Sequence, residues 1–209
     1  MLPPKKRQKV LALLETEYGN TTTALSFKTN FQLLVATIMS AQSTDVQVNK
    51  ITKPLFEEYP TAASIAGLSL EALEEKIKKV GLYRSKAKNI LATANIIANE
   101  YGGEIPKTRE ELIKLPGVGR KTANVVISVA FGIPAIAVDT HVFRVSNRIG
   151  LANAKNELNT EKQLMENIPE DKWAQAHHWL IWHGRKICKA QNPRCEICPL
   201  QEYCKYFQN

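Results

Sequence analysis

The segment KLPGVGRKTANV, from Lys114 to Val125, decides how this chain folds. Pro116 ends one helix because proline cannot continue helical hydrogen bonding, and Gly117 and Gly119 permit the positive backbone dihedrals of a tight reversal. A second helix then opens with Arg120. The segment therefore predicts two helices joined by a hairpin turn.

The tip of this turn has the properties of a phosphate-binding site. Free backbone N–H groups gather at a helix N-terminus, and Arg120 and Lys121 place two cations beside them. Leu112, Leu115 and Val118 supply an apolar clasp that leaves the Gly-Val-Gly tip open to a nucleic-acid backbone. An ordinary helix-turn-helix corner with glycines kept for packing is the alternative. We interpret the turn as a phosphate clamp formed by Leu115, Pro116, Gly117, Val118, Gly119 and Arg120.

Apolar side chains recur at helical spacing along most of the chain. A first helix is expected after Pro3 and Pro4, with an amphipathic part from Val10 to Tyr18. Further helices are predicted at 31–42, 46–59, 70–80, 86–101, 109–115 and 121–131. Thr61 and Ser69 stand where helix N-caps are expected. Since no β-hairpin signal accompanies these helices, the predicted fold class is all-α.

The stretch 133–138 is ambiguous, because its apolar content could pass for a short strand. A proline interrupts it, so we interpret it as a connection. Asp139 then follows as the N-cap of a helix that carries Val142, Val145 and Ile149 on one face. The positive end of that helix favours the ionised form of the capping carboxylate.

All the cysteines lie near the end of the chain, in the segment KICKAQNPRCEICPLQEYC. The spacing C-x6-C-x2-C-x5-C lets four thiolates converge on one centre, those of Cys188, Cys195, Cys198 and Cys204. Disulfides fit less well, since no secretory segment is present and cysteines two residues apart rarely reach disulfide geometry. Zinc sites usually pair two C-x2-C knuckles, and this segment has one. The spacing favours a [4Fe-4S] cluster over zinc.

Length and composition are those of a globular protein. The chain has 209 residues, 44% of them hydrophobic and 23% charged, which excludes a disordered chain. No apolar run approaches the roughly eighteen residues that span a bilayer, so we expect no membrane partner and a cytoplasmic location. The net charge of +8 suits a polyanionic partner, although a solubilising surplus of cations gives the same value.

Five motifs in a fixed order give the chain a resemblance to a known family. SAQSTD at 40–45 and GLYRSKA at 81–87 precede LPGVGRKTANVV, and AVDTHVFRVSNRIG and the cysteine segment follow it. From Phe31 to Cys204 the chain resembles the endonuclease III family of base-excision DNA glycosylases with AP-lyase activity. The resemblance implies DNA bound in a cleft between two domains. These are a six-helix domain with the helix-hairpin-helix at 22–132, and an iron–sulfur cluster domain formed by 1–21 and 133–209.

The same resemblance implies an activity and its catalytic residues. Such an enzyme acts on double-stranded DNA with damaged pyrimidines or abasic sites, removes the base and cleaves the strand 3′ to the abasic site by β-elimination. The family's nucleophilic lysine falls on Lys121, where a helix N-terminus favours the neutral amine. Asp139 matches the carboxylate that stabilises positive charge developing on the sugar. A plain phosphate contact for Lys121 and a purely structural cap for Asp139 are the alternatives.

The resemblance also implies residues that contact DNA. Gln42 and Leu82 match the family's side chains that fill the gap left by an extruded base. Without the resemblance, Leu82 would be assigned to the hydrophobic core. Asp45 and His141 border the base pocket by similarity to the same family.

The loop between the first two cysteines resembles the family's cluster loop, in which basic side chains meet DNA phosphates. Lys189 and Arg194 are the candidates for this contact. Hydrolysis and elimination consume no electrons, so a structural role for the cluster ranks above a redox role. His177, His178 and His183 are expected to pack around the cluster domain.

Two other functions would use the same motifs differently. One is a monofunctional adenine or thymine mismatch glycosylase. Adenine glycosylases carry a non-lysine residue where Lys121 stands and a further C-terminal domain, for which the five residues after Cys204 leave no room. The other is a non-enzymatic iron–sulfur DNA-binding or redox protein, against which Lys121 with Asp139 argues. We expect a monomeric enzyme associated with the nucleoid.

Overall fold

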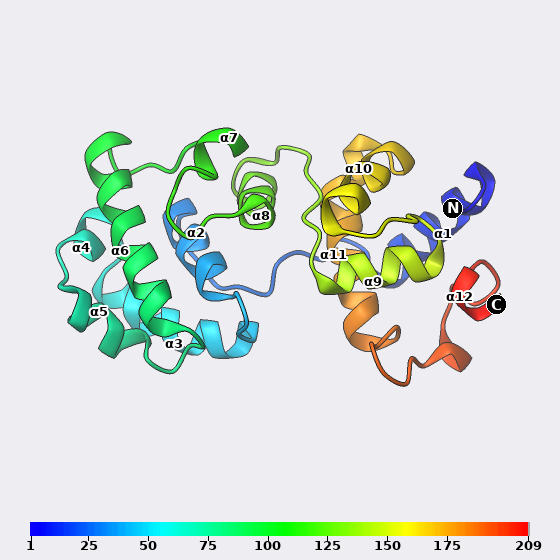
Figure 1. Cartoon of the computed structure of the whole chain (residues 1–209), viewed down its shortest axis with the longest axis horizontal. Coiled ribbons are helices and arrows are strands. Elements are labelled where there is room, and N and C mark those ends of the chain that lie inside the picture. The colour runs from blue at the N-terminus through cyan, green and yellow to red at the C-terminus, as the bar shows by residue number, and fades with distance from the viewer. Residues whose placement is uncertain (209) are drawn as a thin grey trace. The chain divides into compact units, whose positions relative to one another are not determined.

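The computed structural model describes residues 1–208, and the regular structure in this range is entirely helical (Figure 1). The predicted all-α fold class is therefore confirmed. No helix within the described residues is long and apolar enough to cross a membrane. The chain forms two compact units, which we call unit 1 (Met1–Thr23 and the chain from Gly132 onward) and unit 2 (Ala24–Phe131).

Unit 2 is built around a buried helix. Every residue of α2 from Phe31 to Met39 is buried, and α2 packs against α3, α6 and α8. The order of elements is α2 (Asn30–Met39), α3 (Asp45–Glu58), α4 (Ala62–Ala66), α5 (Leu70–Ile77), α6 (Tyr83–Glu100), α7 (Arg109–Leu112) and α8 (Arg120–Phe131). The long helix α6 also packs against α4 and α5. Apolar burial on several sides thus fixes α2 and α6 as the frame of this unit.

Short polar side chains set where the helices of unit 2 begin. Thr29, Thr44 and Thr108 each accept a hydrogen bond from a backbone N–H in the first turn of the following helix. The predicted caps Ser69 and Thr61 are confirmed, and Thr61 forms a reciprocal capping box with Ser64. These caps fix the first turns, and hence the loops that lead into them.

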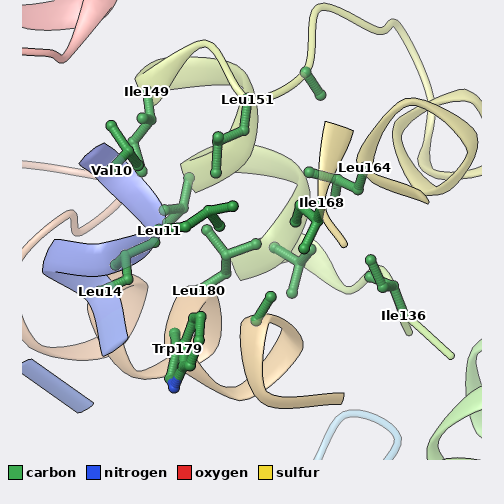
Figure 2. Packing of buried hydrophobic residues seen from close by; sticks show 14 of the residues in the cluster. Val10, Leu11, Leu14, Ile136, Ile149, Leu151, Leu164, Ile168, Trp179 and Leu180 are labelled. Atoms are coloured by element: carbon green, nitrogen blue, oxygen red, sulfur yellow. The ribbon is translucent and has the colours of Figure 1, made fainter. Parts of the chain in front are cut away.

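Unit 1 joins the N-terminal helix to the C-terminal part of the chain. Its elements are α1 (Pro4–Tyr18), α9 (Thr140–Ile149), α10 (Glu157–Asn167), a 3-10 turn (Glu170–Lys172), α11 (Trp173–Lys186), a second 3-10 turn (Cys195–Ile197) and α12 (Lys205–Gln208). Figure 2 shows Leu11 and Leu14 of α1 beside Trp179 and Leu180 of α11 in one apolar core. The helices α1, α9 and α11 therefore share a core although α1 is far from the others in sequence.

Several helix boundaries differ from the prediction. The helix α2 ends at Met39 rather than at Gln42, because Gln42 adopts a left-handed backbone (φ 54°) that no α-helix contains. The helix α6 begins at Tyr83 rather than at Lys86. The helices α5 and α7 end at Ile77 and Leu112, three residues before the predicted ends at 80 and 115. The short α4 was not predicted, since five residues are too few to show a helical period.

The connection predicted at 133–138 is confirmed, since it has no regular structure. Its residues Ala135 to Val138 are nevertheless buried. The Nδ1 atom of His177 lies 2.6 Å from the carbonyl oxygen of Ala137, so this ring nitrogen donates to the buried backbone. The linking segment is thus fixed in the core of unit 1 immediately before Asp139.

The core of unit 1 gives a direct test of stability. Leu14 is fully buried, so Leu14→Ala should lower the free energy of unfolding by about 2–5 kcal/mol. All the tryptophans, at 173, 179 and 182, lie in unit 1, so urea unfolding followed by their fluorescence reports this unit. The control Leu158→Ala, at a side chain 45% exposed, should stay within about 0.5 kcal/mol. Equal effects of the two variants would contradict the assigned core.

A buried histidine predicts how unit 1 responds to acid. Burial lowers the pKa of His178 to about 4, from an ordinary value of 6.5. The unfolded chain therefore binds a proton at a higher pH than the folded one, and stability falls as pH drops from about 6.5 towards 4. Between pH 7 and pH 5 the loss from this residue should be about 2 kcal/mol. His178→Leu should flatten the pH dependence of the urea midpoint, and an unchanged slope would show that His178 is solvated.

Candidate functional site

The hairpin turn of unit 2 lies between α7 and α8, and side chains of α6 pack against it. Gly117 has a positive φ of 77°, and a Cβ atom at this position would lie 2.9 Å from Cβ of Asn89 on α6. The hydroxyl of Thr93, also on α6, donates to the carbonyl oxygen of Pro116 at 2.9 Å. Gly117 is therefore required by both backbone conformation and packing. The apolar clasp is confirmed, since its three side chains are buried: Leu112, Leu115 and Val118.

The second glycine of the turn differs from the prediction. The φ angle of Gly119 is not positive, and a Cβ atom at this position would meet no other atom within 4 Å. Its carbonyl oxygen accepts the first helical hydrogen bond of α8, from Ala123 N at 2.9 Å, so it has the role of a helix-start residue. Arg120 and Lys121 follow in the first turn of α8, and both are exposed. The turn thus presents open backbone and two cations together.

Gln42 and Leu82 lie on two neighbouring loops of unit 2. Both have a left-handed backbone, with φ of 54° and 57°, which is uncommon for residues other than glycine. A Cβ atom on Gly81 would lie 3.2 Å from the carbonyl oxygen of Gln42, so the loop backbones are almost in contact. Leu82 is 60% exposed, which excludes the assignment to the core. Asp45 begins α3, directly after its cap Thr44, and is half-buried.

In unit 1, Asp139 has the predicted capping geometry. Its Oδ1 atom accepts from the backbone N–H of Val142 at 2.8 Å, at the start of α9. His141 is half-buried in the first turn, and its Nδ1 atom lies 3.1 Å from Nη2 of Arg144. Burial lowers the pKa of His141, which favours the neutral imidazole, although Asp139 opposes this. A neutral His141 leaves Asp139 as the negative group at this helix start.

None of the four cysteines, all of which lie in the described part of the chain, forms a disulfide, and their side chains influence one another electrostatically. Burial raises the pKa of Cys198 to about 11, and the other three cysteines add to this rise, whereas the backbone N–H of Leu200 opposes it. Burial also raises the pKa of Cys204, against two backbone N–H groups that point to its sulfur. Four anionic sulfurs here would repel one another without a cationic centre, while the N–H groups suit thiolates.

Arginines on α9 hold the loop that joins the first two cysteines. Arg144 donates to the carbonyl oxygen of Cys188 from Nε and from Nη2, both at 3.1 Å. Arg148 donates to the carbonyl oxygens of Lys189 at 2.7 Å and Ala190 at 3.0 Å, and its Nη1 atom lies 3.7 Å from Sγ of Cys188. Lys189 and Arg194 stand exposed in the loop so held. Its position is therefore set by two guanidinium groups one helical turn apart.

A buried histidine connects the cysteine site with the N-terminal helix. The Nε2 atom of His183 lies 3.5 Å from Sγ of Cys198, and its Nδ1 atom lies 2.9 Å from the hydroxyl of Tyr18 on α1. A thiolate only accepts hydrogen bonds, so a bound Cys198 requires the proton of His183 on Nε2. The Nδ1 atom of His183 then accepts a hydrogen bond from the hydroxyl of Tyr18. The prediction that the histidines pack around this part of the chain agrees with the burial of His177, His178 and His183.

These observations fit an iron–sulfur cluster with cysteine ligands. Such clusters are stabilised by cysteines outside disulfides, by backbone N–H donors to sulfur, and by an imidazole and a guanidinium beside the sulfurs, all of which this site has. Among residues 1–208, no three His, Cys, Asp or Glu side chains lie close enough to hold a single metal ion. A cluster differs in this respect, because its four thiolates bind four separate irons.

Sequence reasoning missed several residues that position the others. Arg144 and Arg148 stand four residues apart on one helix, a spacing that marks a common face but not its target. Asn89 and Thr93 support the hairpin from a helix without any motif at these positions. The buried Lys86 was quoted within GLYRSKA without a role. Only the fold shows what these side chains contact.

Comparisons with known proteins agree with this geometry. The family model described as HhH-GPD superfamily base excision DNA repair protein matches residues 35–170. The model of the iron-sulfur binding domain of endonuclease III matches residues 188–204, which include all four cysteines. Endonuclease III of Bacillus subtilis (strain 168) is 54% identical over 179 residues, which cover 85% of this chain and 82% of the relative. Endonuclease III of Escherichia coli (strain K12) is 46% identical over 201 residues, which cover 96% and 95%.

Solved structures give the same relationship. A trapped endonuclease III–DNA covalent intermediate superposes with a TM-score of 0.95 at 47% identity, covering 100% of this chain and 98% of that chain. A thermostable thymine-DNA glycosylase superposes with a TM-score of 0.86 at 27% identity, covering 98% and 97%.

The arginine contacts predict how long the cluster survives. Arg148→Met removes the donors to the loop carbonyls and the N–H group beside Cys188 Sγ, so the loop should loosen and the cluster should be lost faster in air. The visible absorbance of the cluster and the bound iron, followed over time, measure this loss. Lys155→Met, at an exposed site of the same unit, should behave like the parent protein. Equal decay of the two variants would remove Arg148 from this role.

Proposed function

Because the chain belongs to the endonuclease III family of HhH-GPD base-excision DNA repair proteins, we propose that it is a bifunctional DNA glycosylase and AP lyase. It binds double-stranded DNA, removes oxidised or otherwise damaged pyrimidines and cleaves the strand 3′ to the abasic site. The observation that carries the proposal is an exposed lysine in the first helical turn after the hairpin, Lys121. A passive DNA-binding protein has no need of a nucleophile at this position.

Lys121 supplies the nucleophile. Its neutral amine attacks C1′ of the damaged nucleoside, the bond from C1′ to the base breaks, and the base leaves with a proton. Opening of the sugar ring then gives an imine between C1′ and Nζ. The imine acidifies the proton on C2′, and loss of this proton expels the 3′ phosphate by breaking the C3′–O3′ bond. Hydrolysis of the imine returns the free amine.

Asp139 is the carboxylate of the reaction. As an anion it stabilises the positive charge that develops on the sugar when the base leaves, and it acts as a proton acceptor in the reaction. Its hydrogen bond to Val142 N, at 2.8 Å, keeps the side chain in one rotamer at the positive end of α9. The capping role and the catalytic role are compatible, since both require the ionised form.

Gln42 and Leu82 fill the gap that an extruded base leaves in the duplex. Their left-handed loops project an amide and an apolar side chain from neighbouring points of unit 2. The amide is suited to hydrogen bonding with the estranged base, and the leucine replaces lost stacking. By similarity to the family, Asp45 and His141 each contact the damaged base.

Backbone contacts to DNA come from the hairpin and from the cluster loop. The open backbone at Gly119 and the cation of Arg120 bind a phosphate without reading a base. Lys189 and Arg194 meet phosphates from the loop that the α9 arginines hold. The [4Fe-4S] cluster, bound by Cys188, Cys195, Cys198 and Cys204, holds this loop and the end of unit 1 in place.

The two units correspond in this proposal to a helix-hairpin-helix domain (unit 2) and a cluster domain (unit 1). The enzyme acts as a monomer on DNA of the nucleoid in the cytoplasm. The similarity to a thymine-DNA glycosylase is weaker in identity than the similarity to endonuclease III, 27% against 47%. A mismatch-specific glycosylase is therefore the second candidate.

Replacing the nucleophile separates catalysis from DNA binding. Lys121→Gln should lower the rate of strand cleavage at a damaged pyrimidine by several orders of magnitude, because the covalent route is lost. Affinity for the same duplex should stay within a few-fold, since one phosphate-facing cation contributes little. Single-turnover cleavage and fluorescence anisotropy measure the two quantities. Lys114→Gln, at an exposed lysine on the other side of the turn, is the matched control with nearly full activity.

Retained cleavage in Lys121→Gln would place the nucleophile elsewhere and contradict the proposal. Base release without strand cleavage, in the parent protein, would instead favour a monofunctional glycosylase.

A further inference from the structure

Unit 2 contains one buried lysine without an assigned role. Lys86 lies in the first turn of α6 and is only 5% exposed. Its ammonium group donates to the carbonyl oxygen of Met39 at 2.8 Å, to that of Ala41 at 2.5 Å and to the hydroxyl of Ser43 at 3.2 Å. An ammonium group has three N–H donors, so these acceptors satisfy all of them. These acceptors belong to the last residue of α2 and to the turn that follows it.

The surroundings explain how a charge is kept at this buried place. Met39 is the last residue of α2, where carbonyl oxygens without helical partners carry partial negative charge, and Ala41 follows in the turn after the C-cap Ser40. Burial lowers the pKa of Lys86, so the carbonyl contacts must offset a desolvation cost. A residue needed only to fill this space would be apolar. The polar end of Lys86 is therefore directed at the loop.

The loop that Lys86 holds carries Gln42 in its left-handed conformation. A left-handed backbone at a non-glycine residue costs roughly 1–3 kcal/mol and persists only where the surroundings enforce it. Lys86 binds residues on both sides of Gln42, at Ala41 and Ser43. The turn is closed further by Ser43 N, which donates to the carbonyl oxygen of Ser40 at 3.1 Å. These contacts are what keep Gln42 in place.

The same lysine is joined to the Leu82 loop through its backbone. Lys86 N donates to the carbonyl oxygen of Leu82 at 3.1 Å, the first helical hydrogen bond of α6. A second contact ties the segment before Leu82 to α3, since Nε2 of Gln47 in the first turn of α3 donates to the carbonyl oxygen of Lys79 at 3.2 Å. Lys86 is thus bonded through its amide to one loop and through its ammonium group to the other.

We propose that Lys86 is a positioning residue that holds Gln42 and Leu82 as one preformed wedge for the space left by an extruded base. This inference rests on the proposed function of Gln42 and Leu82. The wedge is ordered before DNA binds, so the entropy of ordering two loops does not oppose base extrusion. Lys86 itself touches neither the base nor the reacting atoms.

The test compares two duplexes that differ opposite the lesion. One holds an oxidised thymine opposite an ordinary base, and the other holds it opposite a stable abasic analogue, which leaves no estranged base for the wedge to contact. Lys86→Met keeps the apolar stem and removes the three donors. We expect it to slow single-turnover excision in the first duplex by about ten- to a hundredfold. Excision in the second duplex should change far less. Lys88→Met, at an exposed lysine on the same helix, is the control.

A double-mutant cycle links the effect to the wedge. If Lys86 acts through Gln42, then Lys86→Met adds little to Gln42→Ala, whereas independent effects multiply. Ser43→Ala removes one acceptor and should show a smaller loss with the same dependence on the opposite base. Thermal unfolding shows whether Lys86→Met is folded. If it is not, Ser43→Ala provides the same test with a smaller expected effect.

The outcomes distinguish the positioning role of Lys86 from the proposed role of Gln42 and Leu82 on which it rests. Equal slowing of Lys86→Met on both duplexes, or no slowing, overturns the positioning role while leaving Gln42 and Leu82 untouched. Unchanged excision in Gln42→Ala and Leu82→Ala instead overturns the proposed wedge itself.

Discussion

One face of α6 supports two of the loops of unit 2 that we assign to DNA, the turn after α2 and the hairpin. Lys86 binds the turn after α2, Asn89 lies against Gly117, and Thr93 donates to the carbonyl oxygen of Pro116. These residues recur at helical spacing, so a single rigid element fixes the hairpin and the Gln42 turn relative to each other. Loops of this kind are normally mobile, and their support by buried polar side chains limits the entropy lost on binding.

The helix α9 has the corresponding role in unit 1. Its N-terminus is capped by Asp139, and its later turns carry Arg144 and Arg148, which bind the backbone of the cysteine loop. The apolar face of the same helix, Val142, Val145 and Ile149, is buried in the core around α1 and α11. One helix therefore sets the proposed catalytic carboxylate, the cluster loop and the core. Substitutions that destabilise the core of unit 1 should therefore weaken the binding of the cluster and also disturb the position of the Asp139 carboxylate.

Much of this arrangement could be predicted because it depends on local chemistry. The hairpin, its apolar clasp and the cap at Asp139 follow from residue types within a few positions of one another. Contacts across long sequence separations could not be predicted. Lys86 meets acceptors more than forty residues away, and no local pattern indicates them. The prediction of a positive φ for Gly119 was wrong. Both residues are glycines in the same turn, so the sequence alone treats them alike, whereas in the structure Asn89 of α6 packs against Gly117 and no atom lies near the Cβ position of Gly119.

The central claim is that the amine of Lys121 becomes covalently bound to DNA. Borohydride reduces an imine to a stable amine, so the parent protein incubated with a damaged duplex and borohydride should form a cross-linked species. Proteolysis and mass spectrometry of that species identify the modified residue. We expect the added nucleotide mass on the peptide that contains Lys121 and on no other lysine. A mass located on a different residue, or no cross-link with a duplex whose base is nevertheless removed, would contradict the assignment.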